Sequence, residues 1–400
     1  GYMKCVILGG GISGLSAAWF YRKKYPDAEI TLLEKQERLG GCIATKTQRP
    51  FRFEMGPRTF QRARSPELLS LIRELGLESD LVFSDPTAST RYLWIRGHLR
   101  KMASLWPQIV RALAQDVVMP RSVGEEESIY EFARRRFGQQ AAEVFFDPLA
   151  KGVFGGDMRK LSLSACFPSL HRLERTKRSI LLGLLSKPKQ PSGLFTLRGG
   201  MSQLIEALRR SPTTIHSNCS VEAILPGYVV AGGRKWVADC IICALPGNEA
   251  AKLTQVPLAL RNEKISVVNL GYEGKTTLQG YGYLIPSSEK EELLGQIWDS
   301  AVFPGSEYTC FTSMVRSASP ETATLSAMRR HLGETREPLA IWSQEAEIPQ
   351  YDVGHAERIN QFTSKIRARF PGLELVGNYL SGPSVEACIS HCKSKIFITS

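Results

Sequence analysis

The chain opens with a short apolar run that leads through a cluster of glycines into an amphipathic segment. Residues 5–8 are all apolar, a run that suits a buried strand and is too short for a buried helix. Glycines occupy positions 9–11, and the residues after them have the periodicity of a helix. A second apolar strand is predicted at 29–33. The pattern therefore predicts a strand–turn–helix–strand unit of the α/β class.

Further along, the pattern changes twice. Apolar positions recur at helical spacing over 85–193, which predicts a helical insert. Alternating apolar and polar positions over 251–349 predict a domain with a mixed sheet. From 373 the chain returns to a strand, a glycine turn and a helix, as at its start. We therefore expect two insertions in one α/β domain, which is formed by residues 1–84, 194–250 and 350–400.

The first glycine cluster has the spacing of a dinucleotide-binding turn. Gly9 permits the tight turn, Gly11 leaves room for a pyrophosphate, and Gly14 lets the helix pack closely on the strand. Phosphates would lie at the helix N-terminus, where free N–H groups and the dipole favour an anion. Glu34 follows the second strand and can accept the hydroxyls of a ribose, but its charge would repel a 2′-phosphate. The alternative is a turn with a purely structural role.

A second glycine turn follows at residues 37–42. Gly40 and Gly41 would let backbone N–H groups approach an anion, and Arg38 would supply its counter-charge. The alternative is a surface turn with an exposed arginine. Gly56 and Pro57 form a further turn whose apolar flanks suit backbone lying along a flat ring.

Composition and charge narrow the class of partner. Hydrophobic residues make up 43% of the chain and charged residues 22%, which is typical of a globular protein. The net charge of +12 suits nucleic acid, an anionic membrane or an acidic substrate. No nucleic-acid motif accompanies the basic residues, so we favour the last two and expect no nucleic-acid partner. The predicted helix at 105–113 could lie in a membrane interface or face its own core.

The start of the chain lacks the basic flank of a signal peptide, and no apolar stretch is long enough to span a membrane. The nine cysteines are irregularly spaced and do not suggest a disulfide framework. Cys240 and Cys243 lie three apart on a predicted strand, so they should point to opposite faces, and we do not expect them to share a metal or form a redox disulfide. We expect a cytoplasmic protein bound peripherally to the inner face of a membrane. The sequence leaves the oligomeric state open, a homodimer included.

Taken together, the glycine turns and Glu34 resemble the flavin amine oxidase and protoporphyrinogen oxidase superfamily, which implies FAD rather than NAD. Other segments resemble the protoporphyrinogen oxidases more specifically, almost from end to end. The resemblance implies a Rossmann-like FAD-binding domain (α/β), an inserted mixed-sheet substrate domain (α+β) and an inserted helical membrane-association domain. The segments that carry it are 53–58, 134–138, 151–157, 161–168, 178–184, 281–289 and 348–351.

The resemblance implies oxidation of protoporphyrinogen IX to protoporphyrin IX in three hydride-transfer steps, with dioxygen reoxidising the FAD to give hydrogen peroxide. Because the flavin accepts the hydride, no catalytic side chain is implied. Arg91 is implied to pair with a propionate of the tetrapyrrole, although an isolated arginine would be a surface residue. Tyr281 and Leu284 are implied to sandwich a pyrrole, or else are core residues of a strand. A third apolar wall would come from Phe311 or Met314.

We expect no bound metal, because no metal-ligand spacing occurs in the chain. The cofactor-binding residues that the motifs and the resemblance imply are Gly9, Gly10, Gly11, Ile12, Ser13, Gly14, Glu34, Lys35, Arg38, Gly40, Gly41, Gly56, Pro57, Arg58, Thr59, Val221, Gly382, Pro383, Ser384 and Val385.

Three alternatives remain open. Relatives within the family oxidise coproporphyrinogen III, whose four carboxylates call for a wider and more basic site. The second alternative is a flavin amine oxidase or a carotenoid desaturase. Cys388 lies near the position where some amine oxidases attach FAD covalently. The third is a module that binds FAD without catalysis.

Overall fold

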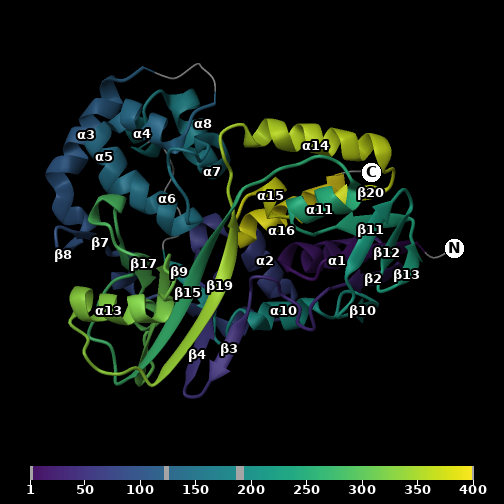
Figure 1. Cartoon of the computed structure of the whole chain (residues 1–400), viewed down its shortest axis with the longest axis horizontal. Coiled ribbons are helices and arrows are strands. Elements are labelled where there is room, and N and C mark those ends of the chain that lie inside the picture. The colour runs from purple at the N-terminus through teal and green to yellow at the C-terminus, as the bar shows by residue number, and fades with distance from the viewer. Residues whose placement is uncertain (1–2, 121–125, 186–192, 399–400) are drawn as a thin grey trace.

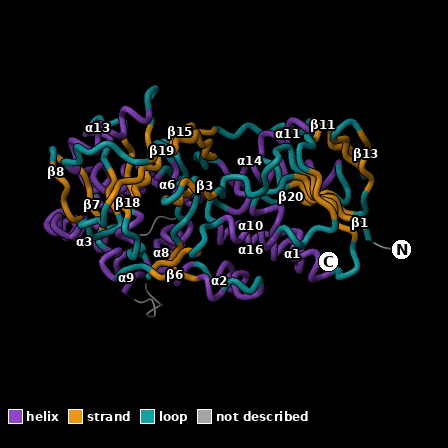
Figure 2. The backbone as a smooth tube through the Cα atoms, turned by 90° about the horizontal axis from the view of Figure 1, so that it is seen from below, coloured by secondary structure: helices purple, strands orange, loops and turns teal. Residues whose placement is uncertain are grey.

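Two sheets lie at opposite ends of an elongated molecule, with a helical region next to the second sheet (Figures 1 and 2). This computed structural model describes residues 3–120, 126–185 and 193–398. Both chain ends lie near the first sheet (Figure 1). Strand β1 near the N-terminus and strand β20 near the C-terminus are both part of the first sheet.

The first sheet has five parallel strands in the order β10-β2-β1-β14-β20. The first strand of the chain is thus the central one, with segments from three distant parts of the sequence beside it. Its strands are mostly apolar, since a parallel sheet is covered on both faces. They are β1 (Lys4–Leu8), β2 (Glu29–Leu33), β10 (Thr214–His216), β14 (Cys240–Cys243) and β20 (Leu373–Leu375).

Alternate residues of β1 point to the two faces of this sheet, and each face has its own core. Cys5 and Ile7 pack against α1, α2, α10 and α16. Val6 and Leu8 pack against α11, α14 and the antiparallel strands β11–β13. The covering elements are α1 (Ile12–Lys24), α2 (Pro66–Glu74), α10 (Ser202–Leu208), α11 (Gly247–Thr254), α14 (His355–Arg369), α16 (Val385–Ile398), β11 (Val221–Leu225), β12 (Tyr228–Ala231) and β13 (Arg234–Val237).

The second sheet has seven strands in the order β19-β15-β18-β17-β16-β7-β8. Helix α13 (Pro320–Leu332) covers one of its faces, where Tyr283 and Phe311 are buried. The opposite face is turned toward the helical region, through α6 (Asp147–Phe154), and toward the turn that holds Arg58. The strands are β7 (Arg91–Ile95), β8 (His98–Lys101), β15 (Asn262–Glu273), β16 (Gly282–Leu284), β17 (Leu293–Ile297), β18 (Tyr308–Val315) and β19 (Ala340–Pro349).

Strands β7 and β8 differ from the predicted division of the chain, which assigned residues 85–193 to a helical insert. β7 pairs in parallel with β16, so residues 91–101 belong to the second sheet. The hairpin is short, and the segments that follow it in the sequence have strong helical periodicity. The hairpin residues were therefore assigned to the helical insert together with those segments. The helical region proper begins after this hairpin.

A buried ion cluster holds the helical region together. Arg136 has no exposed surface, and its guanidinium bonds to the carboxylates of Asp116 at 2.5 Å and Glu174 at 3.1 Å. Asp116 also accepts hydrogen bonds from Ser179 and the first residues of α9, so this cluster joins four helices, α3, α4, α8 and α9. The helices are α3 (Trp106–Val118), α4 (Ile129–Phe137), α5 (Gln139–Ala141), α6 (Asp147–Phe154), α7 (Leu163–Cys166), α8 (Pro168–Lys177) and α9 (Ile180–Leu185).

Short elements connect these units, namely β3 (Thr45–Gln48), β4 (Phe51–Glu54), β5 (Phe60–Gln61), β6 (Leu81–Phe83), β9 (Leu194–Leu197), α12 (Asp299–Val302) and α15 (Asn378–Ser381). All nine cysteines are free thiols, and Cys240 and Cys243 pack in different cores, as their spacing predicted. Within the described part of the chain, every helix is too short or too polar to cross a bilayer.

Candidate flavin and substrate site

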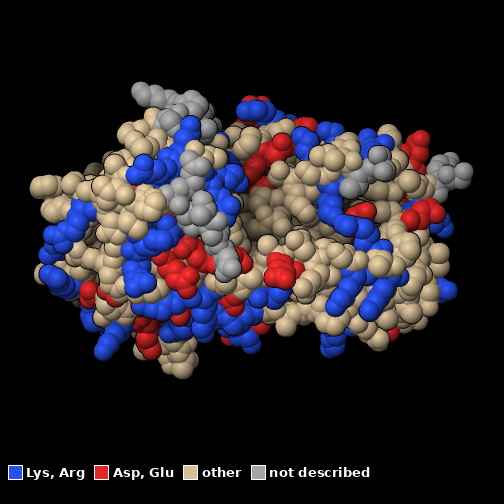
Figure 3. Space-filling view, turned by 90° about the horizontal axis from the view of Figure 1, so that it is seen from above, with Lys and Arg blue, Asp and Glu red and all other residues tan. Residues whose placement is uncertain are grey.

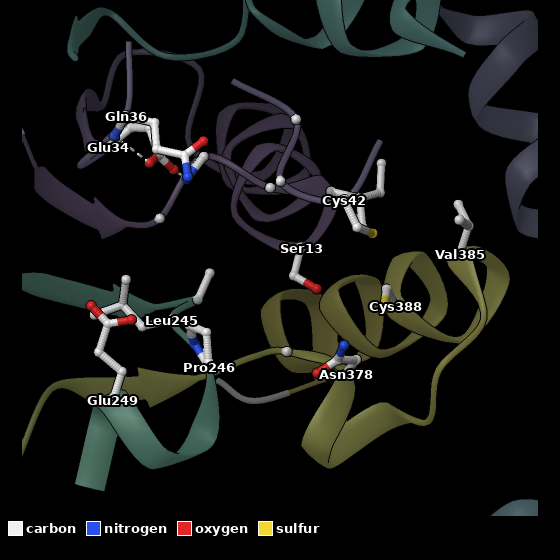
Figure 4. A pocket seen from close by; sticks show the side chains of 18 of the residues that line it. Ser13, Glu34, Gln36, Cys42, Leu245, Pro246, Glu249, Asn378, Val385 and Cys388 are labelled. Atoms are coloured by element: carbon white, nitrogen blue, oxygen red, sulfur yellow. Dashed lines mark hydrogen bonds between the residues drawn. The ribbon is translucent and has the colours of Figure 1, made fainter. Parts of the chain in front are cut away.

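A pocket of about 290 Å³ opens at the carboxyl ends of β1, β2, β14 and β20 (Figure 4). Ligands of open parallel sheets bind at this edge, because the loops that follow neighbouring strands meet there. Predicted cofactor residues that line the pocket are Gly9, Gly10, Gly11, Ile12, Ser13, Glu34, Lys35, Gly40, Gly41, Pro57, Pro383 and Val385.

The three spaced glycines of the first turn have different surroundings. Gly9 has a φ of +97°, a conformation that side chains disfavour. A Cβ on Gly14 would lie 1.9 Å from the carbonyl oxygen of Gly9, so only glycine lets α1 pack this closely. A Cβ on Gly11 would meet nothing nearer than the Cα of Gly41 at 3.9 Å. The space beside Gly11 is therefore open to a ligand.

This open space lies at the N-terminus of α1, which no side chain caps and whose first turn holds no acidic residue. The uncapped N–H groups and the helix dipole together favour a phosphate there. The carboxylate of Glu34 is fixed by the backbone N–H groups of Gly10 (2.9 Å) and Gln36 (2.8 Å) at the side of the same pocket. These features fit the pyrophosphate and the ribose of an adenine dinucleotide.

The second glycine turn lies directly against the first. Gly11 and Gly40 form a bridge, and the N–H of Gly40 donates to the carbonyl of Gly10 at 2.8 Å. The guanidinium of Arg38 donates to the carbonyls of Leu39, Gly41 and Ile43 at 2.7–3.0 Å. Arg38 therefore stabilises this turn through its backbone carbonyls and is not among the pocket-lining residues. We had predicted that it would be the counter-charge of a bound anion.

Other predicted cofactor residues lie close to the pocket without lining it. Gly56 is packed so tightly that a Cβ would lie 2.2 Å from the carbonyl oxygen of Cys42. The hydroxyl of Ser384 accepts a hydrogen bond from the N–H of Ala387 at the start of α16. Val221 begins β11 and packs against the second core of the first sheet. The predicted residues outside the lining are Gly14, Arg38, Gly56, Arg58, Thr59, Val221, Gly382 and Ser384.

The pocket also has lining residues that the sequence did not single out as ligands. Most of them follow β14 and β20, so only the strand order of the folded sheet brings them to this edge. Glu249 of α11 lies 3.8 Å from the ammonium of Lys35, and both residues line the pocket. These further residues are Gln36, Cys42, Ala244, Leu245, Pro246, Glu249, Gly377, Asn378 and Cys388.

Arg58 connects the flavin-binding turn to the second sheet. It follows the pocket residue Pro57, and its guanidinium donates to the hydroxyl of Thr312 on β18. The carboxylate of Asp299 lies 3.6 Å from the same guanidinium and 2.6 Å from the same hydroxyl. Burial raises the pKa of Asp299, although Arg58 and Thr312 oppose that shift. A polar cluster therefore connects the pocket-lining turn to the second sheet.

The register of the second sheet shows which predicted substrate residues share a face. Paired residues of neighbouring strands point to the same side. Arg91 pairs with Gly282, two residues from Leu284, and Leu284 pairs with Gly295, which in turn pairs with Met314. Arg91, Leu284 and Met314 therefore lie on one face, which also carries Thr312; we refer to it as the inner face.

Contacts on the inner face support this arrangement. The guanidinium of Arg91 lies over the ring of Tyr281, 4.2 Å from its centre. Leu284 and Met314 flank Gly295, where a Cβ would lie 2.8 Å from Leu284 Cδ2 and 3.5 Å from Met314 Cε. A cation, an aromatic ring and two apolar side chains thus gather on the sheet that Arg58 links to the flavin pocket.

Phe311 is on the opposite face. It is one residue from Thr312 along β18, so its side chain points the other way. There it packs edge-on against Tyr272 in the core beneath α13, with ring centres 5.9 Å apart. Of the two residues predicted for the third apolar wall, the structure thus places Met314 and not Phe311 beside Leu284. Among the described residues, no cluster of His, Cys, Asp and Glu could hold a metal.

Comparison with known proteins identifies the family. The family model of the flavin containing amine oxidoreductases matches residues 12–332. The chain is 31% identical to the protoporphyrinogen oxidase of Bos taurus, over 96% of this chain and 95% of that protein. It is 26% identical to the coproporphyrinogen III oxidase of Bacillus subtilis, over 98% and 96% of the two chains.

Solved structures agree on the fold. A crystal structure from Exiguobacterium sp. 255-15 superposes with a TM-score of 0.85 at 23% identity, covering 99% of this chain and 98% of that one. Putrescine oxidase with bound putrescine superposes at 0.73, with 15% identity over 99% and 98% of the two chains. The resemblance read from the motifs is confirmed. The chain belongs to the flavin containing amine oxidoreductases, and it is an oxidoreductase with FAD as its cofactor.

Proposed function

We propose that this enzyme oxidises protoporphyrinogen IX to protoporphyrin IX. The relatives named protoporphyrinogen oxidase, in animals, plants and a yeast, match 96–97% of the chain. The observation that carries the proposal is the inner face of the second sheet. There the Arg91–Tyr281 pair lies on the same sheet as two apolar side chains, and Arg58 joins this sheet to the flavin pocket.

Each inner-face residue has a role that its chemistry supports. The guanidinium of Arg91 can hold a propionate through two parallel hydrogen bonds. The ring of Tyr281 beneath it keeps the cation oriented. Leu284 and Met314 provide apolar surface for a flat macrocycle and exclude water from it. Bound FAD would supply the two-electron oxidation of each of the three steps, with dioxygen as the acceptor that restores it.

Charge on the molecular surface favours an acidic substrate. Lys and Arg side chains lie on both sides of a hollow in the middle of one face, and a few Asp and Glu side chains also border it (Figure 3). Together with the net charge of +12, this distribution would attract a carboxylate-bearing molecule. Four carboxylates would be attracted as well as two, so coproporphyrinogen III is the competing substrate.

We also propose that the protein is bound peripherally to the cytoplasmic face of a membrane; the attachment itself is supported by exposed apolar residues of the helical region. Helix α3 exposes Trp106 and Val110 one turn apart, and the adjoining α9 exposes Leu182 and Leu185. Asp116 of α3 joins the two helices through the hydroxyl of Ser179 at 2.6 Å. An apolar surface with basic residues around it is typical of helices that lie in the interface of an anionic bilayer.

Anaerobic mixing of the purified flavoprotein with each tetrapyrrole tests the proposal. We expect protoporphyrinogen IX to bleach the flavin absorbance, and air to restore it with the appearance of protoporphyrin fluorescence and hydrogen peroxide. A higher kcat/KM for coproporphyrinogen III would assign the chain to that substrate instead. No bleaching by either would favour a binding module, and yellow colour that stays with acid-precipitated protein would favour a covalent amine-oxidase type.

A further inference from the structure

A buried lysine lies next to the apolar residues of the inner face. Lys151 belongs to α6, which packs against β16 and β17 (Figure 1). The next residue, Gly152, lies so close to Leu284 that a Cβ would be 2.5 Å from Leu284 Cδ2. Lys151 is 8% exposed, and its ammonium donates to the carbonyl of Ile285 at 3.1 Å. The ammonium of Lys151 therefore lies at the carbonyl of Ile285, the residue that follows Leu284, whose side chain we expect to contact the substrate.

This ammonium has no carboxylate partner within ion-pair distance in the described part of the chain. The nearest acid along the helix is Asp147, whose two oxygens accept hydrogen bonds from the N–H and the hydroxyl of Ser287 at 2.7 and 2.8 Å. A buried cation costs free energy unless an anion or several acceptors compensate it. Burial lowers the pKa of Lys151; the nearby charge of Asp147 opposes that shift, and the charge of Arg316 adds to it.

We infer that Lys151 binds a carboxylate of the tetrapyrrole and is the second cation of the substrate site. Ile285 is three residues from Gly282, the partner of Arg91, so the two cations belong to positions about 10 Å apart along the sheet. That spacing is within the span of a tetrapyrrole. Leu284 lies between them, where the macrocycle would rest. Arg91 and Lys151 thus select a substrate with carboxylates on two different pyrroles.

A purely structural role does not need the charge. The carbonyl of Ile285 is a single neutral acceptor, which a water molecule or an amide could satisfy equally well. The two remaining N–H donors of the ammonium have no acceptor among the described residues. A buried polar group of this kind calls for an explanation, and an anionic ligand supplies one.

This inference rests on the proposed function, so its test compares a diacid with a neutral analogue. Steady-state kinetics of the holoenzyme are measured with protoporphyrinogen IX and with its dimethyl ester. In Lys151→Met we expect KM for the diacid to rise about tenfold, as for one lost charge-assisted hydrogen bond, with little change in kcat. KM for the ester should change far less. Lys151→Arg should keep KM for the diacid close to that of the wild type.

The controls separate this inference from the proposed function. Lys160→Met removes an exposed lysine six residues beyond the end of α6 and should leave both KM values unchanged. If the wild type oxidises neither compound, the proposed function fails. If the wild type is active and Lys151→Met has an unchanged KM for the diacid, Lys151 is not a ligand. Should Lys151→Met lose its FAD, Lys151→Gln replaces it, and the failure of both to fold would overturn the inference in favour of a structural role.

Discussion

The guanidinium of Arg91, at the start of β7 in the second sheet, lies 4.2 Å from the centre of the Tyr281 ring. Arg91 is itself exposed, so the ring restricts a cation that would otherwise be mobile. Because the N–H of Tyr281 donates to the carbonyl of Thr90 at 2.9 Å, the two side chains come from adjacent strands that are tied together. The pair presents a pre-oriented cation to an anionic ligand.

Replacing Arg91 by alanine should weaken substrate binding and leave the cofactor in place. We expect KM for protoporphyrinogen IX to rise about tenfold or more, because a charge-assisted pair with a propionate is lost. The flavin content should not change, since Arg91 is not among the residues that line the flavin pocket. Steady-state kinetics and the flavin absorbance measure both effects. Arg367→Ala on α14 removes a distant exposed arginine as the control, and equal KM values in the two variants would contradict the assignment.

The three spaced glycines of the first turn should differ in what they support. Gly11→Ala adds a Cβ into open space, so the apoprotein should lose less than about 1 kcal/mol of unfolding free energy while FAD binding weakens strongly. Gly14→Ala places a Cβ 1.9 Å from a backbone oxygen and should destabilise the apoprotein by about 1–3 kcal/mol. Denaturant unfolding of the apoproteins and FAD titration separate the two effects. Tight FAD binding by Gly11→Ala would refute the pyrophosphate assignment.

The glycine turns could be predicted because their geometry depends on residues close in sequence. Most of the lining residues after β14 and β20 could not, since they reach the pocket only through the order of the strands; Pro383 and Val385 were implied by the family resemblance. Phe311 and Met314 show a second limit. They belong to the same strand and lie three residues apart, so they point to opposite faces, and only the position of the strand in the folded sheet shows which face each one takes. The β7–β8 hairpin was likewise not predicted, because the helical periodicity of the neighbouring segments was the stronger signal and because β7 pairs with β16, almost two hundred residues away in the sequence.

Met314 and Phe311 should respond differently to truncation. Met314→Ala should raise KM for the tetrapyrrole, because it removes apolar surface from the inner face beside Leu284. Phe311→Ala should lower the free energy of unfolding by about 3–5 kcal/mol, because the ring is buried beneath α13. Kinetics and denaturant unfolding of each variant test this division. A stable Phe311→Ala enzyme with impaired KM would restore Phe311 as the substrate wall.

Asp116 should make the helical region sensitive to acid. Burial alone would raise its pKa, but hydrogen bonds from Arg136, Ser179 and the backbone of α9 outweigh it and hold the pKa below the ordinary 3.8. As the pH falls through 3.8, Asp116 takes up a proton in the unfolded chain before it does so in the folded protein. The ionised carboxylate therefore stabilises the fold above that pH, and this stabilisation is lost in stronger acid, as the pH falls through the lower pKa of the folded state.

At neutral pH, Asp116→Ala should cost about 3 kcal/mol, because it removes one of the two carboxylates that compensate the buried Arg136 and leaves only Glu174. Urea unfolding at pH 7, followed through a probe in the helical region, measures this loss. Asp85→Ala is the control, since Asp85 caps only a surface turn through the N–H of Thr87. A loss equal to that of Asp85→Ala would show that the buried pair contributes little.

Membrane attachment should depend on the apolar surface that α3 and α9 share. Trp106→Ser combined with Leu185→Ser removes side chains that are 65% and 73% exposed, so the fold should persist while sedimentation with anionic vesicles falls several-fold. Val237→Ser removes an equally exposed residue (63%) from β13 of the flavin domain and should leave sedimentation unchanged. Turnover in detergent should be alike in all three proteins, because neither surface contributes to the inner face. If the wild type stays in the supernatant with anionic vesicles at low salt, the apolar surface has another partner and the membrane proposal is wrong.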